Sequence, residues 1–280
     1  MFEIHNRVIR EGDGSSTPLI LTNAYPVDGR MWERCAQRIA ALADEAGLPD
    51  FAIWAPDMPG SGLSPAPSDA QSGRRASNGS YPDALDRMAE SYVAMMHAAG
   101  YDKAVWVGLS MGGYLVTDLY RLHPEAVAGV ALCDTMASSD GIGGEARLET
   151  SNACESTDSV QPVMHFAQAG PDDSTVKRSQ AFIDQMTAWI HDQNAGLAWR
   201  QRMTYGRPEL AGVPERMDVP VAVISGELDP TSNPSVMKPL AQRIGGNAVF
   251  TPIADCGHFS AVEHPDTVAA ALVDLMRRVD

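Results

Sequence analysis

The chain of 280 residues contains few cysteines and no long hydrophobic run. Its four cysteines form no C-x-x-C pair and show no cysteine–histidine spacing of a zinc site, so we expect free thiols and no bound metal. No apolar stretch approaches the roughly 18 residues that a membrane-spanning helix requires. The N-terminus, M-F-E-I-H-N-R, lacks the basic and apolar regions of a signal peptide, which predicts a cytoplasmic location.

Basic residues are also scarce. Lysine and arginine total 21 against 36 aspartates and glutamates, and the formal net charge is -15 at pH 7. The acidic residues are spread along the chain and do not form a tail. This charge argues against nucleic acid or an anionic membrane as a partner, and it weakly disfavours highly anionic substrates. We therefore expect a small-molecule partner.

Hydrophobic residues make up 44% of the chain, enough for a large core. The length fits one α/β domain with an insertion or two small domains, and the pattern favours the first. Short apolar runs alternate with stretches of helical spacing, which is typical of a mostly parallel sheet covered by helices. The runs that we predict to be strands are 18–22, 51–54, 104–108, 127–133, 219–225 and 248–253.

Two segments break this alternation. Residues 66–80 are small and polar and predict an exposed loop. Residues 136–217 lack strand patterns and carry predicted helices near 143–154, 159–168 and 175–203. We interpret 136–217 as a helical cap inserted into a core formed by 1–135 and 218–280.

The pentapeptide G-L-S-M-G at 108–112 lies between a predicted strand and a predicted helix. This is the context of a G-x-S-x-G nucleophile elbow, in which a tight strand-to-helix turn lifts the serine side chain out of the sheet. Glycines at both flanking positions leave room for such a turn. The pattern predicts that Ser110 is a nucleophile, and a nucleophilic serine requires a base and an orienting acid later in the chain.

Asp229 follows the predicted strand 219–225 in the segment I-S-G-E-L-D-P. The carboxyl ends of parallel strands are where such sheets gather functional groups, so Asp229 is our candidate for the acid. Asp134 ends the preceding strand and is the competing candidate.

Seven histidines compete for the role of base. His258 lies just after the last predicted strand and before the last helix, and this position favours it. His165 and His191 fall in the predicted cap, where a role at the pocket stays open.

Four motifs together resemble those of an α/β hydrolase from the group of esterases, lactonases and meta-cleavage-product hydrolases. They are N-A-Y-P-V-D-G-R-M-W at 23–32, D-M-P-G-S-G-L-S at 57–64, G-L-S-M-G-G at 108–113, and the segments of Asp229 and His258. The order Ser110, Asp229, His258 is that of this family. The resemblance covers nearly the whole chain and implies the α/β hydrolase fold, with the cap inserted after the sixth strand.

The resemblance also implies an oxyanion hole made by the backbone N–H groups of Tyr25 and Met111. The family usually has His-Gly where this chain has Asn23 and Ala24. Asn23 can still hydrogen-bond the loop, but Ala24 gives up the free access to positive φ that glycine has. Asp57 of the second motif is expected to hold its turn by hydrogen bonds.

These features predict a serine carboxylesterase that cleaves a small-to-medium apolar ester through an acyl-enzyme, without metal or cofactor. No charged residue of the cap stands out as a partner for a substrate carboxylate. Tyr25, Phe166 and Trp189 are the predicted pocket residues. A lactonase or a C–C bond hydrolase with the same triad is the alternative, and a ligand-binding protein without catalysis is an alternative of another class.

Overall fold

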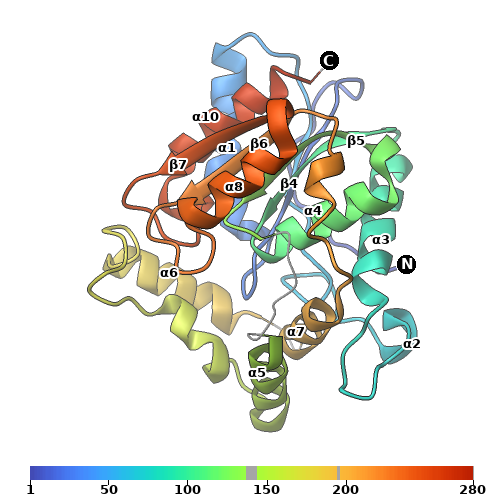
Figure 1. Ribbon diagram of the computed structural model, residues 1–280, viewed down its shortest axis with the longest axis vertical. Coiled ribbons are helices and arrows are strands. Elements are labelled where there is room, and N and C mark those ends of the chain that lie inside the picture. The colour runs from blue at the N-terminus through green and yellow to red at the C-terminus, as the bar shows by residue number, and fades with distance from the viewer. Residues whose placement is uncertain (137–143, 194–195, 280) are drawn as a thin grey trace.

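The computed structural model describes residues 1–136, 144–193 and 196–279 (Figure 1). A sheet of seven strands crosses these residues in the order β1-β3-β2-β4-β5-β6-β7. The strands are β1 (Val8–Arg10), β2 (Leu19–Thr22), β3 (Ile53–Trp54), β4 (Ala104–Leu109), β5 (Val127–Cys133), β6 (Val221–Gly226) and β7 (Ala248–Ile253). β1 pairs antiparallel with β3, and the other pairs are parallel. The expected α/β fold with a mostly parallel sheet is confirmed.

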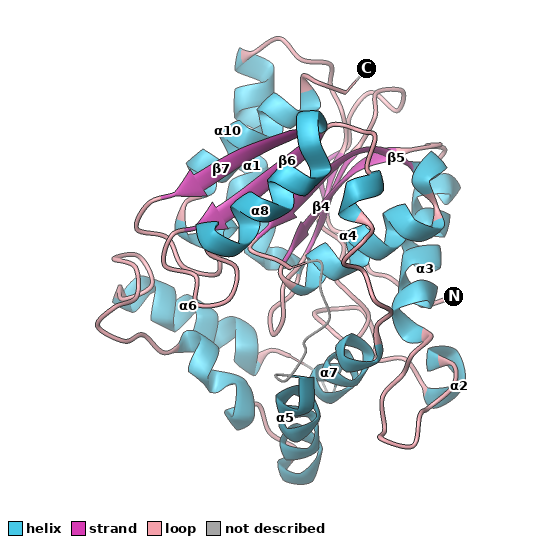
Figure 2. Cartoon of the chain, viewed as in Figure 1, coloured by secondary structure: helices cyan, strands magenta, loops and turns pink. Residues whose placement is uncertain are grey.

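Helices cover the sheet because its central strands are apolar along their whole length. Every residue of β4 and β5 is buried, as expected for strands with packed layers on both faces. The α-helices of the layers are α1 (Glu33–Glu45), α3 (Ala84–Ala98), α4 (Met111–Leu122), α8 (Pro234–Ile244), α9 (Ser260–Glu263) and α10 (Pro265–Met276). Short 3-10 turns are η1 (Gly29–Trp32), η2 (Pro124–Ala126) and η6 (Gly245–Asn247). In Figure 2 the magenta strands lie between these cyan helices, with α1 packed beside α10 and α3 beside α4.

The chain leaves the sheet after β5 and returns at β6. This segment contains α5 (Gly144–Thr157), η4 (Gln161–Ala167), α6 (Gln180–His191), α7 (Gly196–Gly206) and η5 (Pro214–Arg216), and its described residues form no strand. Figure 1 shows α5, α6 and α7 beyond the carboxyl ends of the strands. This segment follows β5, the fifth strand of the described chain, whereas the family pattern predicted it after the sixth strand. The count differs because β1 alone precedes β2 among the described residues.

The expected single helix over 175–203 is wrong. α6 starts only after Ser179, whose side chain caps it by accepting from the N–H of Phe182 at 3.3 Å. α6 ends at His191, and a separate helix, α7, begins at Gly196. Between them the Gln193 side chain turns inward and donates to Asp28 at 3.1 Å. The predicted run therefore consists of two helices, and the residue two positions after the first helix contacts a distant loop.

Most of residues 66–80 are exposed, as expected, but the segment also contains a short helix and two buried serines. The helix is α2 (Asp69–Ser72), which begins with a capping box between Ser68 and Gln71. Ser72 is fully buried, and its hydroxyl accepts from the Trp199 indole N–H of α7 at 2.7 Å. This loop therefore supports the inserted helices. No helix among the described residues is long and apolar enough to cross a membrane.

Candidate active site

The turn between β4 and α4 places Ser110 at the carboxyl edge of the sheet. Its backbone has φ 55° and ψ -114°, a conformation that non-glycine residues rarely adopt. A Cβ on Gly108 would lie 2.3 Å from the carbonyl carbon of Gly112, and one on Gly112 would lie 2.5 Å from the carbonyl oxygen of Thr22. Both flanking positions therefore require glycine. Thr135 secures the turn by donating to the Ser110 carbonyl at 2.7 Å.

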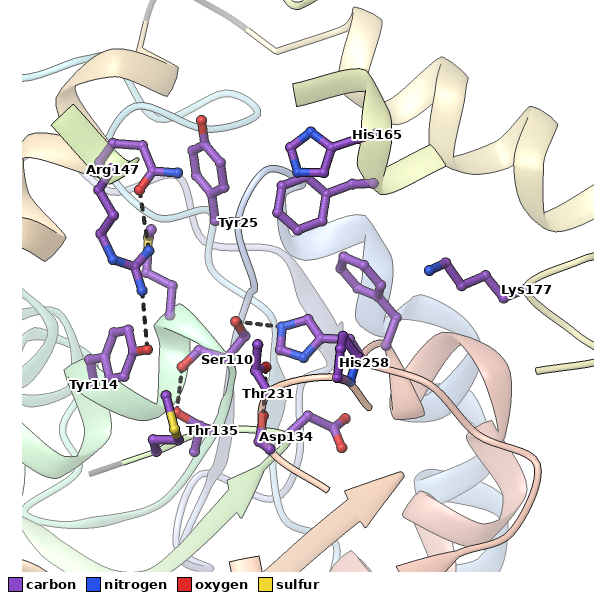
Figure 3. Close-up of a pocket in the computed structure, with 17 residues that line it drawn as sticks. Tyr25, Ser110, Tyr114, Asp134, Thr135, Arg147, His165, Lys177, Thr231 and His258 are labelled. Carbon is purple, nitrogen blue, oxygen red and sulfur yellow. Dashed lines mark hydrogen bonds between the residues drawn. The ribbon is translucent and has the colours of Figure 1, made fainter. Parts of the chain in front are cut away.

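Two loops bring an imidazole and a carboxylate to this serine. His258, after β7, lies with its Nε2 2.8 Å from the Ser110 Oγ (Figure 3). Its Nδ1 lies 2.7 Å from Oδ2 of Asp229, which follows β6. Since an ionised carboxylate can only accept, Nδ1 carries the proton and Nε2 is left to accept the hydroxyl proton of Ser110. The three residues predicted from sequence are thus connected by hydrogen bonds.

The charges of this pair stabilise each other. Burial opposes ionisation of Asp229, but the charge and hydrogen bond of His258 outweigh it and hold the pKa of Asp229 well below its usual range. Burial likewise opposes protonation of His258, and Asp229 outweighs that effect and raises the pKa of the imidazole. Thr231 and Ser232 also donate to Asp229, at 2.9 to 3.0 Å. The environment therefore favours an imidazolium, the form that appears when a serine is deprotonated.

Asp134, the competing acid, is bound to the backbone. Its Oδ1 accepts from the N–H of Gly226 at 2.9 Å and its Oδ2 from the N–H of Ser260 at 3.1 Å. Complete burial, assisted by the negative charge of Asp229, raises the pKa of Asp134 to about 7. Asp229 is therefore the carboxylate that contacts the histidine. Asp134 instead links the end of β6 to the segment after β7 through its two backbone hydrogen bonds.

The loop after β2 lies against Ser110. Asn23 is buried and donates to the carbonyls of Ala24 at 3.1 Å and Val27 at 2.8 Å, while its Oδ1 accepts from the N–H of Met58 at 3.0 Å. Ala24 is not among the residues with positive φ, so the turn does not need the glycine that the family usually has there. Tyr25 lines the same cavity as Ser110. Asn23 thus holds the loop as the sequence suggested.

Asp57 holds the neighbouring turn. It is fully buried and accepts from the N–H groups of Gly29 and Leu63 at 2.9 and 3.0 Å. Arg7 also donates to it from two guanidinium nitrogens, at 2.9 and 3.1 Å. These bonds fit the expected structural role, because both oxygens of the carboxylate are bound to groups that hold the turn.

A cavity of about 390 Å³ opens above Ser110 and His258. One wall is a series of rings in edge-to-face contact. Tyr25 and Phe166 have centroids 6.0 Å apart, Phe166 and Phe259 6.3 Å, and Phe259 and His258 5.5 Å. Such contacts fix ring orientations and give the cavity an apolar side.

Two of the three predicted pocket residues, Tyr25 and Phe166, line this cavity, and Trp189 does not. Trp189 lies instead in a separate surface hollow beside Arg30 and Met31. The reason is the orientation of α6, whose buried residues are Phe182, Met186 and Ile190, so that Trp189 projects to one side of the inward face.

The cavity also contains cationic groups that the sequence did not single out. Arg147 of α5 donates to the Gln201 side chain at 3.2 Å and to the Tyr114 hydroxyl at 3.4 Å. Lys177 pairs with Asp173 at 2.8 Å. Figure 3 shows the two cations at opposite sides of the cavity. From the sequence, no charged residue of this segment stood out as a partner for a substrate carboxylate, whereas the structure places these two on the cavity wall. α5 is polar on most sides, so periodicity could not show which face turns inward.

His165 also lines the cavity, beside Phe166, with ring centroids 4.3 Å apart. Its Nδ1 lies 3.1 Å from the carbonyl of Pro162. In the part of the chain that the structure describes, no three histidine, cysteine, aspartate or glutamate side chains gather to hold a metal ion. The chemistry that this arrangement supports is proton transfer and nucleophilic attack by Ser110.

Comparison with known proteins gives the same picture at the level of the family. The sequence model described as "Alpha/beta hydrolase family" matches residues 19–271. A curated relative, epoxide hydrolase A of Mycobacterium tuberculosis, is 24% identical over 96% of this chain and 93% of its own length. Among solved structures, a thermophilic esterase from Thermogutta terrifontis superimposes with a TM-score of 0.81, 24% identity and coverage of 99% of this chain and 93% of that one. An enol-lactonase from Burkholderia xenovorans superimposes with a TM-score of 0.77 and 22% identity, and the match covers 99% of this chain and 97% of that one.

Proposed function

Because this chain belongs to the alpha/beta hydrolase family, we propose that it is a serine carboxylic ester hydrolase that acts through an acyl-enzyme on Ser110. The observation that carries the proposal is the hydrogen-bonded series Ser110, His258, Asp229, with contacts of 2.8 and 2.7 Å. A serine nucleophile also separates this chain from the epoxide hydrolases of the fold, which by family resemblance attack with an aspartate at this position.

The proposed reaction has two halves. Ser110 attacks the ester carbonyl while His258 takes its proton and then gives it to the leaving alcohol, and Asp229 keeps the imidazole oriented. Water repeats the sequence on the acyl-enzyme and releases the acid. No step in this scheme calls for a metal or a cofactor.

The backbone N–H groups of Met111 and Tyr25 form the proposed oxyanion hole. Met111 is the first residue of α4, so its N–H has no acceptor inside the helix and is free to face the substrate oxygen. Each donor of this kind typically lowers the barrier by about 2.7 to 4 kcal/mol.

Residues 136–217 are the proposed cap on a core of 1–135 and 218–280. Support comes from the cavity itself, whose walls include Arg147 of α5, Phe166 of η4 and Gln201 of α7 as well as residues of the core. A cap in this place would exclude water and select the acyl or alcohol group. Its aromatic wall suits a small-to-medium apolar group.

A lactone or ester that carries a carboxylate is the second candidate substrate. The observation in its favour is the pair of cations, Arg147 and Lys177, on the cavity wall. A C–C bond hydrolase with the same triad is also compatible with the site. A binding protein without catalysis is disfavoured, because the three residues already have the spacing that proton transfer needs.

Labelling and turnover together test the proposal. We expect a fluorophosphonate to modify Ser110, and p-nitrophenyl acetate and butyrate to be hydrolysed. Ser110→Ala should abolish both while the far-ultraviolet circular dichroism stays unchanged. Folded protein that shows neither labelling nor turnover would contradict the esterase, and full activity in Ser110→Ala would contradict the mechanism.

A substrate panel then separates the candidates. Neutral short-chain esters, simple lactones, carboxylate-bearing half-esters and vinylogous diketones are compared by kcat/KM. We expect neutral esters to be the best substrates. A preference for lactones or diketones by ten-fold or more would replace the esterase by one of the alternatives.

A further inference from the structure

A buried arginine of the inserted helices lies against the loop that carries Tyr25. Arg200 of α7 has no exposed surface and is one of the largest fully buried side chains. A guanidinium in the interior is costly unless its N–H groups find acceptors. Burial lowers the pKa of Arg200 to about 10, so the group remains cationic at neutral pH.

The contacts of Arg200 converge on residues 25–27. Its Nη1 donates to the carbonyl of Val27 at 2.9 Å and its Nη2 to the carbonyl of Pro26 at 3.3 Å. The guanidinium carbon lies 5.1 Å from the centre of the Tyr25 ring, within cation–π range. Nη2 also donates to the Gln193 side chain at 3.0 Å, which anchors the guanidinium between α6 and α7.

The same loop is held from the other side by Asn23. The carbonyl of Val27 accepts from both Asn23, at 2.8 Å, and Arg200, at 2.9 Å. One residue belongs to the core and the other to the insertion, 173 positions farther along the chain than Val27. Both the core and the insertion therefore hold the backbone next to Tyr25.

We propose that Arg200 is a positioning residue that orients the Tyr25 N–H in the oxyanion hole. This inference rests on the proposed esterase function. The guanidinium binds the carbonyls of Pro26 and Val27, the two residues that follow Tyr25, and its face lies over the Tyr25 ring, so it holds both the side chain of Tyr25 and the backbone on its C-terminal side. The inserted helices thus complete the oxyanion hole in addition to covering the cavity.

Arg202 provides a matched control on the same helix. It is 6% exposed and donates to the carbonyl of Gly79 at 3.3 Å and to Glu155 at 2.7 Å. None of these contacts reaches the Tyr25 loop. A merely structural role for buried arginines of α7 would make the two positions equivalent.

The experiment compares Arg200→Lys and Arg200→Met with Arg202→Lys in the full chain. Lysine keeps the charge but loses the planar fork, and methionine loses both. Three quantities are measured for p-nitrophenyl butyrate: kcat, KM and the inhibition constant of an alkyl boronic acid, whose tetrahedral adduct places an oxygen in the oxyanion hole. The melting temperature is recorded for each variant.

We expect both Arg200 variants to lose about 10- to 100-fold in kcat, less than the loss of a complete oxyanion donor, with KM within about two-fold. Boronate affinity should fall in parallel with kcat. Arg202→Lys should lower the melting temperature and leave kcat and boronate affinity nearly unchanged. Equal effects at the two positions, or kcat retained in a folded Arg200 variant, would overturn the proposal.

If neither Arg200 variant folds, Gln193→Ala provides a second test of the proposed role. It removes one anchor of Nη2 and keeps the arginine, so kcat should fall a few-fold at constant KM. Unchanged kcat and boronate affinity there would overturn the proposal. If the wild-type protein is neither labelled at Ser110 nor active on any ester, the proposed function fails and this inference fails with it. A labelled, active wild type with unaffected variants contradicts the role of Arg200 alone.

Discussion

Asp229 and Asp134 follow neighbouring strands of the sheet, and their hydrogen bonds differ in kind. Asp229 contacts the imidazole of His258, whereas Asp134 accepts only from backbone N–H groups in the described contacts. The two carboxyls also have opposite pKa shifts, because His258 compensates the burial of Asp229 while Asp134 has no bonded cation to do so. Each residue therefore supports a separate prediction.

Replacement by asparagine separates the two aspartates kinetically. Asp229→Asn removes the acceptor that fixes the imidazole tautomer, and we expect kcat to fall by roughly 10⁴-fold. Asp134→Asn keeps one carbonyl acceptor for the backbone and should change kcat by less than about ten-fold, with a loss of about 1 to 3 kcal/mol in unfolding free energy. Steady-state kinetics and urea unfolding measure both effects. A larger kinetic loss in Asp134→Asn would assign the acid role to Asp134.

The pH dependence of stability tests Asp134 independently. Its pKa is about 7 in the folded protein against 3.8 as the ordinary value, so between these values the folded protein binds more protons than the unfolded chain. Stability contributed by the protonated carboxyl is therefore lost as pH rises through this window. We expect wild type to lose about 2 kcal/mol more than Asp134→Asn between pH 4.5 and 6.5. Parallel curves for the two proteins would contradict the shifted pKa.

At the scale of elements, the His258 loop depends on α9. Glu263 is buried and accepts from the N–H of Gly257 at 2.7 Å and of Phe259 at 3.1 Å, the two residues that flank His258. Its carboxylate also accepts from the hydroxyl of Ser174 in the insertion. One carboxylate thus holds both sides of the histidine and connects them to the inserted segment.

Glu263→Gln and Ser174→Ala distinguish these two connections. Glutamine has a single acceptor oxygen, so one buried N–H loses its partner, which costs about 1 to 3 kcal/mol. Since that N–H lies beside His258, we expect kcat to fall as well. Ser174→Ala keeps both backbone bonds and should cost about 1 kcal/mol with little change in kcat. Chemical unfolding and ester hydrolysis provide the two readouts, and equal kinetic losses would contradict a specific role of Glu263 at the loop.

Local patterns of the sequence predict those elements whose formation depends on their own residues. The apolar runs become strands, and G-L-S-M-G becomes the turn at Ser110, because glycine at 108 and 112 is a steric requirement of that turn. Two other features depend instead on packing between distant segments. They are the orientation of Trp189 and the contacts of Arg200. Periodicity carries no information on such contacts, since a polar residue on a helix has the same local signature on either face.

At the scale of the whole molecule, the net charge of the protein and the charges on the cavity wall have opposite signs. The chain carries a net charge of -15, but its candidate substrate cavity is lined by Arg147 and Lys177. Among the described residues on the cavity wall, Asp134 is the one acidic side chain, and burial raises its pKa to about 7. An anionic substrate is thus repelled during approach and stabilised once inside. Salt weakens the first effect more strongly, because exposed charges are screened over about 10 Å at 0.1 M and buried ones much less.

A half-ester with a free carboxylate and a neutral ester of equal length therefore respond differently to salt. We expect kcat/KM for the half-ester to rise about two- to five-fold between 10 and 200 mM sodium chloride, as the surface repulsion is screened, and that for the neutral ester to stay constant. Arg147→Gln should lower kcat/KM for the half-ester at every salt concentration and leave its salt slope unchanged, because this side chain acts within the cavity. The neutral ester serves as the control for folding of the variant. A falling salt profile for the wild type would mean that the cavity cations, and not the acidic surface, dominate the encounter with the substrate.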